Sequence, residues 1–307
     1  MTTTPTPPPR LFNVGSLNID YVYRLSSIVR PGETLAASSR DELAGGKGAN
    51  QSAAAALAGA AVSHVGCVGP DGAWLSDELA RRGVDVSHLR TLGGATTGHA
   101  VIQLDADGEN AIFLFPGANH AIDQSHLDAA LSEAQPGDWV LTQNETNATA
   151  SAVRAAAARG LRVAFNPAPI TPDLEGFPLE EIGLLIVNQT EGEALSGEAE
   201  PGACVEALGR RVAGAAVLTL GSEGAVAHDG TANWVQPAFA AGAVADTTGA
   251  GDTFIGTLLA ALLADGDLSA ALRRAAAAAA LSVIRVGAIA GIPDADEVDR
   301  FLADQDS

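Results

Sequence analysis

From Trp139 onward, short apolar runs of strand length alternate with longer segments that have the composition of helices. This alternation limits the fold more than any other feature, because strands separated by helices of this length pack as a mainly parallel sheet with helices on its faces. The sequence therefore predicts a doubly wound α/β fold. Strands are expected at 139–142, 162–165, 184–187 and 216–220, a hairpin at 224–235, and helices at 148–159, 191–195, 251–264, 268–285 and 297–303.

The first third of the chain has a different pattern, in which exposed strands are joined by turns. Alternation runs from 19 to 42 through Pro31-Gly32, and a second pair of strands surrounds Asp107-Gly108, a dipeptide typical of hairpins. We therefore expect a small β-sheet lid that projects from the core, built from segments near 18–44 and 96–117. Core elements are expected at 11–15, 48–59, 62–68 and 73–82, within one domain of residues 11–307 that follows a disordered tail of residues 1–10.

The charge balance makes two kinds of partner unfavourable. The chain has 17 basic and 37 acidic residues, a formal net charge of −20 at pH 7, so it repels the phosphates of nucleic acids and anionic membranes. Neither a signal peptide nor an apolar run of membrane-spanning length is indicated. We expect a cytoplasmic protein without a disulfide framework, in which Cys67 and Cys204 are buried free thiols.

A Gly-rich string at 246–253, Asp-Thr-Thr-Gly-Ala-Gly-Asp-Thr, directly precedes an expected helix. Backbone N–H groups at such a helix start converge on an anion, and the helix dipole adds partial positive charge. Asp252, in the same turn, could accept the proton of an attacking hydroxyl, which gives the combination of base and anion site that a kinase needs. The alternative is an ordinary Gly-rich loop in which Asp252 is the helix N-cap.

Two polar segments near the N-terminus are candidates for sugar binding. Gly45-Gly46-Lys47-Gly48-Ala49-Asn50 contains the single lysine of the chain and could present donors to sugar hydroxyls, or it could be a tight turn with a solvated Lys47. Asn18 and Asp20 follow the first strand, where doubly wound sheets bind ligands, although a capped turn would also explain them.

Polar residues also follow three later strands. Asn188 and Glu191 could orient hydrated Mg²⁺ beside phosphates, or they could form an N-terminal helix cap. The segment Gln143-Asn144-Glu145 could accept a sugar hydroxyl, and small residues at 219–224 could hold a nucleotide. No metal-ligand cluster or Ser/His/Asp arrangement is indicated, because the histidines are scattered: His64, His88, His99, His120, His126 and His228.

In order along the chain, these strings resemble those of the ribokinase-like, or phosphofructokinase-B type, carbohydrate kinases from Val14 to about Pro293. Gln189 stands where the family more often has Glu, and Gly291 stands where a Ser is expected. The strings that carry the resemblance are Gly15–Asp20, Pro31–Thr34, Gly45–Gln51, Gly117–Asn119, Asn166–Pro169, Asn188–Glu191 and Asp246–Asp252.

The resemblance implies an ATP-dependent kinase that phosphorylates the 5-hydroxyl of D-ribose to give ribose 5-phosphate, with Mg²⁺, a K⁺ site that lacks the Ser at 291, and a homodimer formed through the lid. Asp252 would be the base, and Gly249, Ala250 and Gly251 the anion hole. By position, the sugar would meet Asn18, Asp20, Gly45, Gly46, Lys47, Asn50, Glu145 and Asp252. ATP would meet Asn188, Thr219, Gly221, Gly224 and Gly251, Mg²⁺ would lie near Asn188 and Glu191, and the monovalent cation near Asp246, Thr248, Arg285 and Gly287.

Other functions compete with this hypothesis. Another kinase of the family would act on deoxyribose, fructose, a sugar acid or a nucleoside, a choice that depends on pocket shape. A non-catalytic sugar sensor on the same fold would need no base, so Asp252 and its loop argue against it. A dinucleotide-dependent oxidoreductase is disfavoured, because no Gly-x-Gly-x-x-Gly turn follows the first strand.

Overall fold

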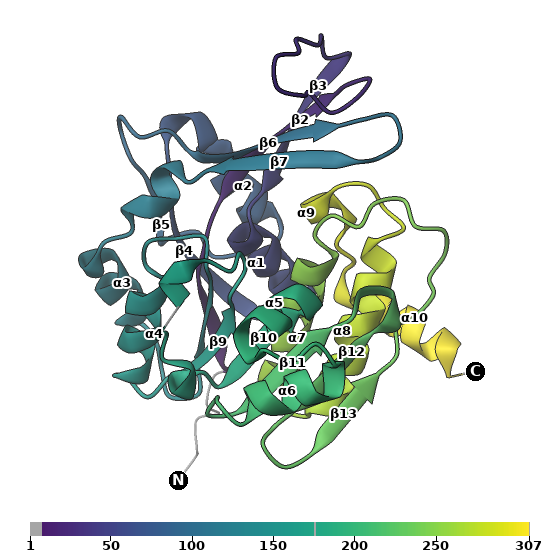
Figure 1. Cartoon of the computed structure of the whole chain (residues 1–307). Helices are drawn as coiled ribbons and strands as arrows, with labels where there is room; N and C mark the ends of the chain where they lie inside the picture. The colour runs from purple at the N-terminus through teal and green to yellow at the C-terminus, as the bar shows by residue number, and fades with distance from the viewer. Residues whose placement is uncertain (1–7, 175, 307) are drawn as a thin grey trace.

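The computed structural model describes residues 8–174 and 176–306, and it contains a large central β-sheet and a small sheet that projects from it (Figure 1). Neighbouring strands of the large sheet are parallel except for the last two, which are antiparallel additions at one edge. The doubly wound α/β prediction is confirmed. In spatial order the strands are β13 (Asn233–Gln236), β12 (Ala225–His228), β11 (Ala215–Thr219), β10 (Leu184–Asn188), β9 (Arg162–Asn166), β8 (Trp139–Gln143), β1 (Arg10–Val14), β4 (Ala61–Val68) and β5 (Leu89–Thr91).

Strand residues alternate between two apolar cores on opposite faces of this sheet. In β10, Leu184 and Ile186 belong to one core, and Leu185 and Val187 belong to the other. Both faces are therefore covered, as a parallel sheet requires. The first core packs against α1 (Lys47–Leu57), α2 (Trp74–Arg81), α7 (Ala250–Asp265) and α8 (Leu268–Ser282), and the second against α3 (Gln124–Leu131), α4 (Thr149–Ala157), α5 (Gln189–Ser196) and α6 (Pro201–Gly209).

The small sheet lies at the top of Figure 1. Its central pair of strands is parallel, and both outer pairs are antiparallel. Many of its apolar side chains are exposed, Ile112 by 54% and Phe113 by 58%. The strands, in spatial order, are β3 (Ser39–Gly45), β2 (Asn18–Arg24), β6 (Gly98–Leu104) and β7 (Asn110–Phe115).

Two predicted boundaries are wrong. Arg10, expected in the tail, begins β1, and its backbone N–H donates to Asp138 (2.7 Å). Residues 1–7 of the predicted tail lie outside the described residues. The helix expected at 268–285 ends at Ser282, because the chain turns there toward Asp246 and then enters α9 (Ala288–Gly291) and α10 (Ala295–Gln305).

Three features of the described chain complete the fold. α3 and α6 were not predicted; they begin at Asp123 and Glu200, whose side chains cap them. Both cysteines are buried and free, as expected. No helix within the described ranges combines the length and the apolar character needed to cross a membrane.

Candidate active site

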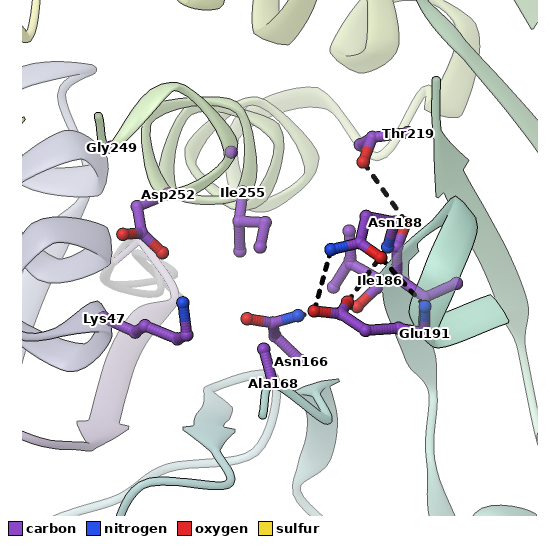
Figure 2. Close-up of a pocket in the computed structure, with 12 residues that line it drawn as sticks. Lys47, Asn166, Ala168, Ile186, Asn188, Glu191, Thr219, Gly249, Asp252 and Ile255 are labelled. Atoms are coloured by element: carbon purple, nitrogen blue, oxygen red, sulfur yellow. Dashed lines mark hydrogen bonds between the residues drawn. The ribbon is translucent and has the colours of Figure 1, made fainter. Parts of the chain in front are cut away.

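A pocket of about 160 Å³ lies at the carboxyl ends of the parallel strands, where doubly wound sheets bind ligands. In Figure 2, Lys47 and Asp252 point toward one another on one side, and Asn188, Glu191 and Thr219 lie on the opposite side. The pocket therefore joins the N-terminal and C-terminal parts of the chain. Its lining residues are Lys47, Asn166, Ala168, Ile186, Val187, Asn188, Glu191, Thr219, Gly249, Gly251, Asp252 and Ile255.

The first turn of α7 supplies a carboxylate and backbone donors. The N-cap is Gly249, whose φ of 76° is in the left-handed region that glycine adopts without strain, so Asp252 is not the cap. The first N–H groups of a helix have no partner within it. That of Ala250 donates to the Thr247 carbonyl (3.2 Å), which leaves those of Gly251 and Asp252 available to an anion.

The start of α1 lies directly against the end of β1. A Cβ at Gly48 would lie 2.4 Å from the backbone nitrogen of Ser16, so this approach requires glycine. The backbone N–H of Ala49 donates to the Ser16 carbonyl (2.9 Å). This packing brings Lys47 and Asn50 beside the residues that follow the first strand.

Two side-chain amides of α1 hold the carboxylate of Asp252. Asn50 Nδ2 donates to its Oδ2 and Gln51 Nε2 donates to its Oδ1, each over 2.8 Å. Burial raises the pKa of Asp252 above its ordinary value, whereas Lys47 and these two hydrogen bonds lower it. The amides therefore favour the ionised form that a general base needs. Asn50 Oδ1 is buried without a partner among the described residues, so it is available to a substrate hydroxyl.

Carboxylates surround the single lysine. Burial lowers the pKa of Lys47, but the nearby carboxylates raise it by more, so the net shift is upward. Because these acidic groups outnumber the lysine, a nucleotide phosphate needs further positive charge to bind beside them. The carboxylates, in order of their effect, are Asp252, Glu145, Glu191 and Asp20.

Two of these acids lie toward the small sheet. The pKa of Asp20 is raised to about 7, first by burial and then by the charges of Glu145 and Asp252. Burial also raises the pKa of Glu145. Its Oε2 accepts hydrogen bonds from the Ser16 hydroxyl (2.5 Å) and from the backbone N–H of Lys47 (3.1 Å). Glu145 therefore ties the loop after β8 to the start of α1.

Asn18 is held at the base of the small sheet by Asn119. The Nδ2 of Asn119 donates to Asn18 Oδ1 (2.8 Å), and its Oδ1 accepts from the backbone N–H of Leu17 (2.9 Å). Asn18 is 6% exposed and Asn119 is 2% exposed, so this pair is part of the buried structure. The arrangement gives a function to the Gly117–Asn119 string.

Asn188 and Glu191 form the helix cap that was one of the two interpretations of these residues. Asn188 Oδ1 accepts from the Glu191 backbone N–H (2.9 Å), and Glu191 Oε2 accepts from the Asn188 backbone N–H (3.0 Å). A carboxylate oxygen accepts more than one hydrogen bond, so Glu191 can also hold a metal-bound water. Within the described ranges, no three His, Cys, Asp or Glu residues are grouped to ligate a metal directly. The oxygen atoms of Asn188 and Glu191 fit a Mg²⁺ ion that keeps most of its bound waters.

Asp246 joins the two loops predicted to hold a monovalent cation. Its Oδ1 accepts from the Thr248 backbone N–H and its Oδ2 from that of Gly287, each over 2.9 Å. Burial raises the pKa of Asp246, but these hydrogen bonds lower it by more. The side chain of Arg285 is engaged elsewhere, in a two-point contact with Glu297 (2.5 and 3.1 Å). Asp246 therefore fixes the two loops relative to one another.

The predicted residues that line the pocket are Lys47, Asn188, Glu191, Thr219, Gly249, Gly251 and Asp252. Asn50 and Glu145 do not line it but bond to Asp252 and Lys47, respectively, whereas Gly221 and Gly224 lie beyond β11, outside the lining. The sequence did not predict several residues of the site. Some of them are polar residues within the strings that resemble the carbohydrate kinase family, and that position was the signal that could have identified them. The missed residues are Ser16, Gln51, Asn119, Asn166, Ala168, Ile186, Val187 and Ile255.

A carboxylate base and unpaired backbone donors at one helix start, beside a pocket at the sheet edge, are the features of an enzyme that transfers a phosphoryl group to a hydroxyl. Comparison with known proteins specifies this class further. Residues 9–295 match the model of the pfkB family of carbohydrate kinases. The chain therefore belongs to the pfkB family of carbohydrate kinases.

Its relatives include ribokinases over nearly their full length. A ribokinase of Haemophilus influenzae is 34% identical over 298 residues, which cover 94% of this chain and 97% of that one. The structure of Arabidopsis thaliana ribokinase complexed with ribose and ATP is similar with a TM-score of 0.86 and 31% identity, over 97% and 99% of the two chains. The Cryptococcus neoformans ribokinase complex with ADP has a TM-score of 0.83 and 33% identity, over 95% and 99%.

Proposed function

We propose that this protein is an ATP-dependent kinase that transfers the γ-phosphate of ATP to the 5-hydroxyl of D-ribose, giving ribose 5-phosphate. The observation that carries the proposal is the carboxylate of Asp252, held by Asn50 and Gln51 at the start of a helix with free N–H groups. The ribokinases at 31% to 34% identity support ribose as the sugar and ATP as the donor.

Asp252 acts as the general base. Each oxygen of its carboxylate accepts one amide hydrogen bond and keeps a lone pair for the sugar hydroxyl. As attack begins, the proton moves to Asp252, while the N–H groups at the start of α7 bind the oxygens of the moving phosphoryl group. Lys47, between Asp252 and Asp20, offsets charge on the same oxygens.

The sugar would bind between the small sheet and α1. Asn18, Asp20 and Glu145 present acceptors there, and the unpartnered Asn50 Oδ1 accepts a further hydroxyl proton. A site built to accept hydrogen bonds discriminates against analogues that lack a hydroxyl, because the buried acceptors are then left unpaired. We therefore expect ribose to be preferred over deoxyribose.

ATP would lie along the opposite side of the pocket, near Asn188, Thr219 and Gly251, and Gly221 and Gly224 would bound the nucleotide farther out. Mg²⁺ would be held through water by Glu191, and it would supply the positive charge that the excess of carboxylates around Lys47 makes necessary. Carbonyls of the loops that Asp246 joins would bind K⁺.

We also propose a cytoplasmic homodimer that forms through the small sheet. Its strands carry exposed aliphatic and aromatic side chains, and exposed apolar patches of this kind mark interaction surfaces. The same sheet would act as the lid that excludes water from the sugar site during transfer.

The test is ADP release with Mg-ATP and a panel of ribose, deoxyribose, fructose, 2-keto-3-deoxygluconate and adenosine, each with K⁺ and with Na⁺. Turnover on ribose above all other acceptors is the expected result. Faster turnover on another acceptor would overturn the choice of sugar and keep the mechanism. Sugar binding without ADP release from any acceptor would overturn the kinase proposal in favour of a sugar sensor.

A further inference from the structure

We propose that Gln51 is a positioning residue for the carboxylate of Asp252, and that Gln143 fixes the orientation of Gln51. The proposal rests on the function of Asp252 proposed above. Gln51 and Gln143 are both 0% exposed, from α1 and the end of β8. Buried amides are costly unless they are hydrogen-bonded, so the partners of these two side chains explain their presence.

The amide of Gln51 can take one orientation in this site. Its Nε2 donates to Oδ1 of Asp252 (2.8 Å) and to Oδ1 of Asn166 (3.2 Å). Asn166 Nδ2 donates to the Ile186 carbonyl (3.0 Å), so its Oδ1, which only accepts, faces Gln51, and the amide nitrogen of Gln51 must lie on that side. The Oε1 of Gln51 then faces Gln143, whose Nε2 donates to it (2.7 Å).

The network continues behind Gln143 to a neutral histidine. Gln143 Nε2 also donates to Asn13 Oδ1 (3.0 Å), and Asn13 Nδ2 donates to the Ser52 hydroxyl (2.8 Å). His64 Nε2 faces the carbonyl oxygen of Gly15 (3.2 Å), which only accepts, so the ring proton is on Nε2. His64 Nδ1 therefore accepts from Ser52 (2.7 Å). Burial lowers the pKa of His64 to about 4, so the ring is neutral at neutral pH.

The orientation of Gln143 has a cost that points to its purpose. With both donor contacts directed at Gln51 and Asn13, Gln143 Oε1 is buried and has no partner among the described residues. A buried unpaired acceptor is destabilising. The protein therefore forgoes one hydrogen bond at Gln143 and keeps the chain of donors that ends on the Asp252 carboxylate.

If Gln51 positions the Asp252 carboxylate, its removal has two consequences that the loss of a purely packing side chain would not have. Removal of the Gln51 amide takes away a hydrogen bond to the charged form of Asp252, so the pKa of that carboxyl must rise further. It also frees the carboxylate to rotate away from the sugar hydroxyl. Removal of the Gln143 amide should also raise the pKa of Asp252, although Gln143 does not contact Asp252. The amide of Gln51 is then free to rotate and to lose its hydrogen bond to the carboxylate.

The experiment compares Gln51→Met and Gln143→Met with wild type, using the pH profile of kcat/KM for ribose and titration of ¹³C-labelled aspartate by NMR. The Asp252 signal is assigned by its loss in Asp252→Asn. For Gln51→Met we expect the acid limb and the NMR titration to move up by about one pH unit. We expect kcat to fall roughly tenfold to a hundredfold, with KM for ribose changed less. Gln143→Met should move both titrations in the same direction by less.

Leu127→Ala is the control, because Leu127 is equally buried but lies in the core on the other face of the sheet. It should lower the melting temperature and leave the acid limb in place. If Gln51→Met does not fold, Gln51→Glu keeps its shape, and repulsion between two carboxylates should move the limb upward still further.

A fall in kcat with an unchanged acid limb and an unchanged NMR titration would overturn the positioning proposal. Failure of the proposed function has a different signature. Full turnover by Asp252→Asn would remove the base from the mechanism, whereas the NMR titration of Asp252 in Gln51→Met would still decide whether Gln51 controls that carboxyl.

Discussion

Gly256 of α7 lies so close to Ala54 of α1 that a Cβ at Gly256 would be 2.5 Å from the Cβ of Ala54. The same Cβ would lie 2.6 Å from the carbonyl oxygen of Gln51. Gly256 is one helical turn after Asp252. The absence of a side chain at Gly256 therefore sets the helix separation at which two amides of α1 reach the carboxylate of Asp252.

Gly256→Ala should weaken both the fold and the reaction. Overpacking of this contact is expected to lower the free energy of unfolding by about 1–3 kcal/mol, measured by urea denaturation. Displacement of α7 should also lower kcat. Gly93→Ala is the control, because no atom lies within 4 Å of its Cβ position. Equal effects of the two substitutions would contradict this account of the helix contact.

Asp252→Asn should abolish most turnover and leave sugar binding nearly intact. A general base contributes roughly a hundredfold to ten-thousandfold to kcat, and an amide cannot take the proton. ADP release measures kcat, and calorimetry with ribose measures the Kd. Asp265→Asn, at the exposed far end of the same helix, should behave as wild type. A kcat near the wild-type value in Asp252→Asn would show that Asp252 is not the general base.

The pKa of about 7 for Asp20 predicts a pH-dependent stability. A folded-state pKa above the ordinary 3.8 means that the folded protein binds the proton more tightly, so the free energy of unfolding falls as pH rises between these values. At pH 8 the ionised form costs at most about 4 kcal/mol. Asp20→Asn should reduce this fall in urea denaturation from pH 5 to 8.5.

Asp77→Asn, an exposed substitution on α2, is the control and should keep the wild-type pH dependence. If Asp20→Asn and wild type lose stability in parallel as pH rises, another group is responsible for the decline.

Gly291→Ser should increase activation by K⁺ relative to Na⁺. A serine hydroxyl would add an oxygen near the loops that Asp246 joins, and hard cations prefer oxygen ligands. A Cβ at Gly291 would lie 3.2 Å from the Ser282 carbonyl oxygen, so only a small local shift is needed. Turnover at increasing K⁺, with Na⁺ as the matched salt, measures the effect. An unchanged K⁺ response would place the cation elsewhere.

Ile112→Asp should convert a dimer into a monomer. The register pairs Asp20 with Leu43 and Ala100, Ala100 with Leu114, and Ile102 with Ile112, so these side chains share one face of the small sheet. On that face Leu43, Ile112 and Leu114 are 43%, 54% and 51% exposed. On the other face His99 packs against Tyr21 and Phe115. On this other face Phe113 and Phe115 are also exposed, by 58% and 48%, so Ile112→Asp tests the aliphatic face separately.

Light scattering coupled to size exclusion gives the mass in solution. Val235→Asp is the matched control, because Val235 is 75% exposed but belongs to β13, in the large sheet. An interface on this face would be refuted if the wild-type protein is a monomer, or if Ile112→Asp is still a dimer.

The fold was predictable from sequence where one local signal was strong. Apolar runs followed by helical spacing located the parallel strands, and Asp107-Gly108 located the hairpin. α3 and α6 were missed because their start signals are single acidic caps, Asp123 and Glu200, without a long periodic pattern. The end of α8 was misjudged because an Ala-rich helix contains no stop signal, and a tertiary contact with Asp246 turns the chain.

The site was predictable as a set of residues but not as a network. Asp252, Lys47 and Asn50 were expected together because their strings occur in the order found in a family. Nothing local indicates that Gln51 donates to Asp252, since this contact joins residues 201 positions apart. Asn188 and Glu191 illustrate the converse, because the cap and the Mg²⁺ interpretation use the same side chains and are compatible.

The separation between Asn50 and Asp252, 202 positions along the chain, also matters during synthesis. Translation produces the segments proposed to bind the sugar first, and the proposed base follows only with α7. A ribosome-bound chain can thus fold much of its sheet while it still has no group able to activate a hydroxyl. We therefore expect a chain that ends before α7 to consume no ATP.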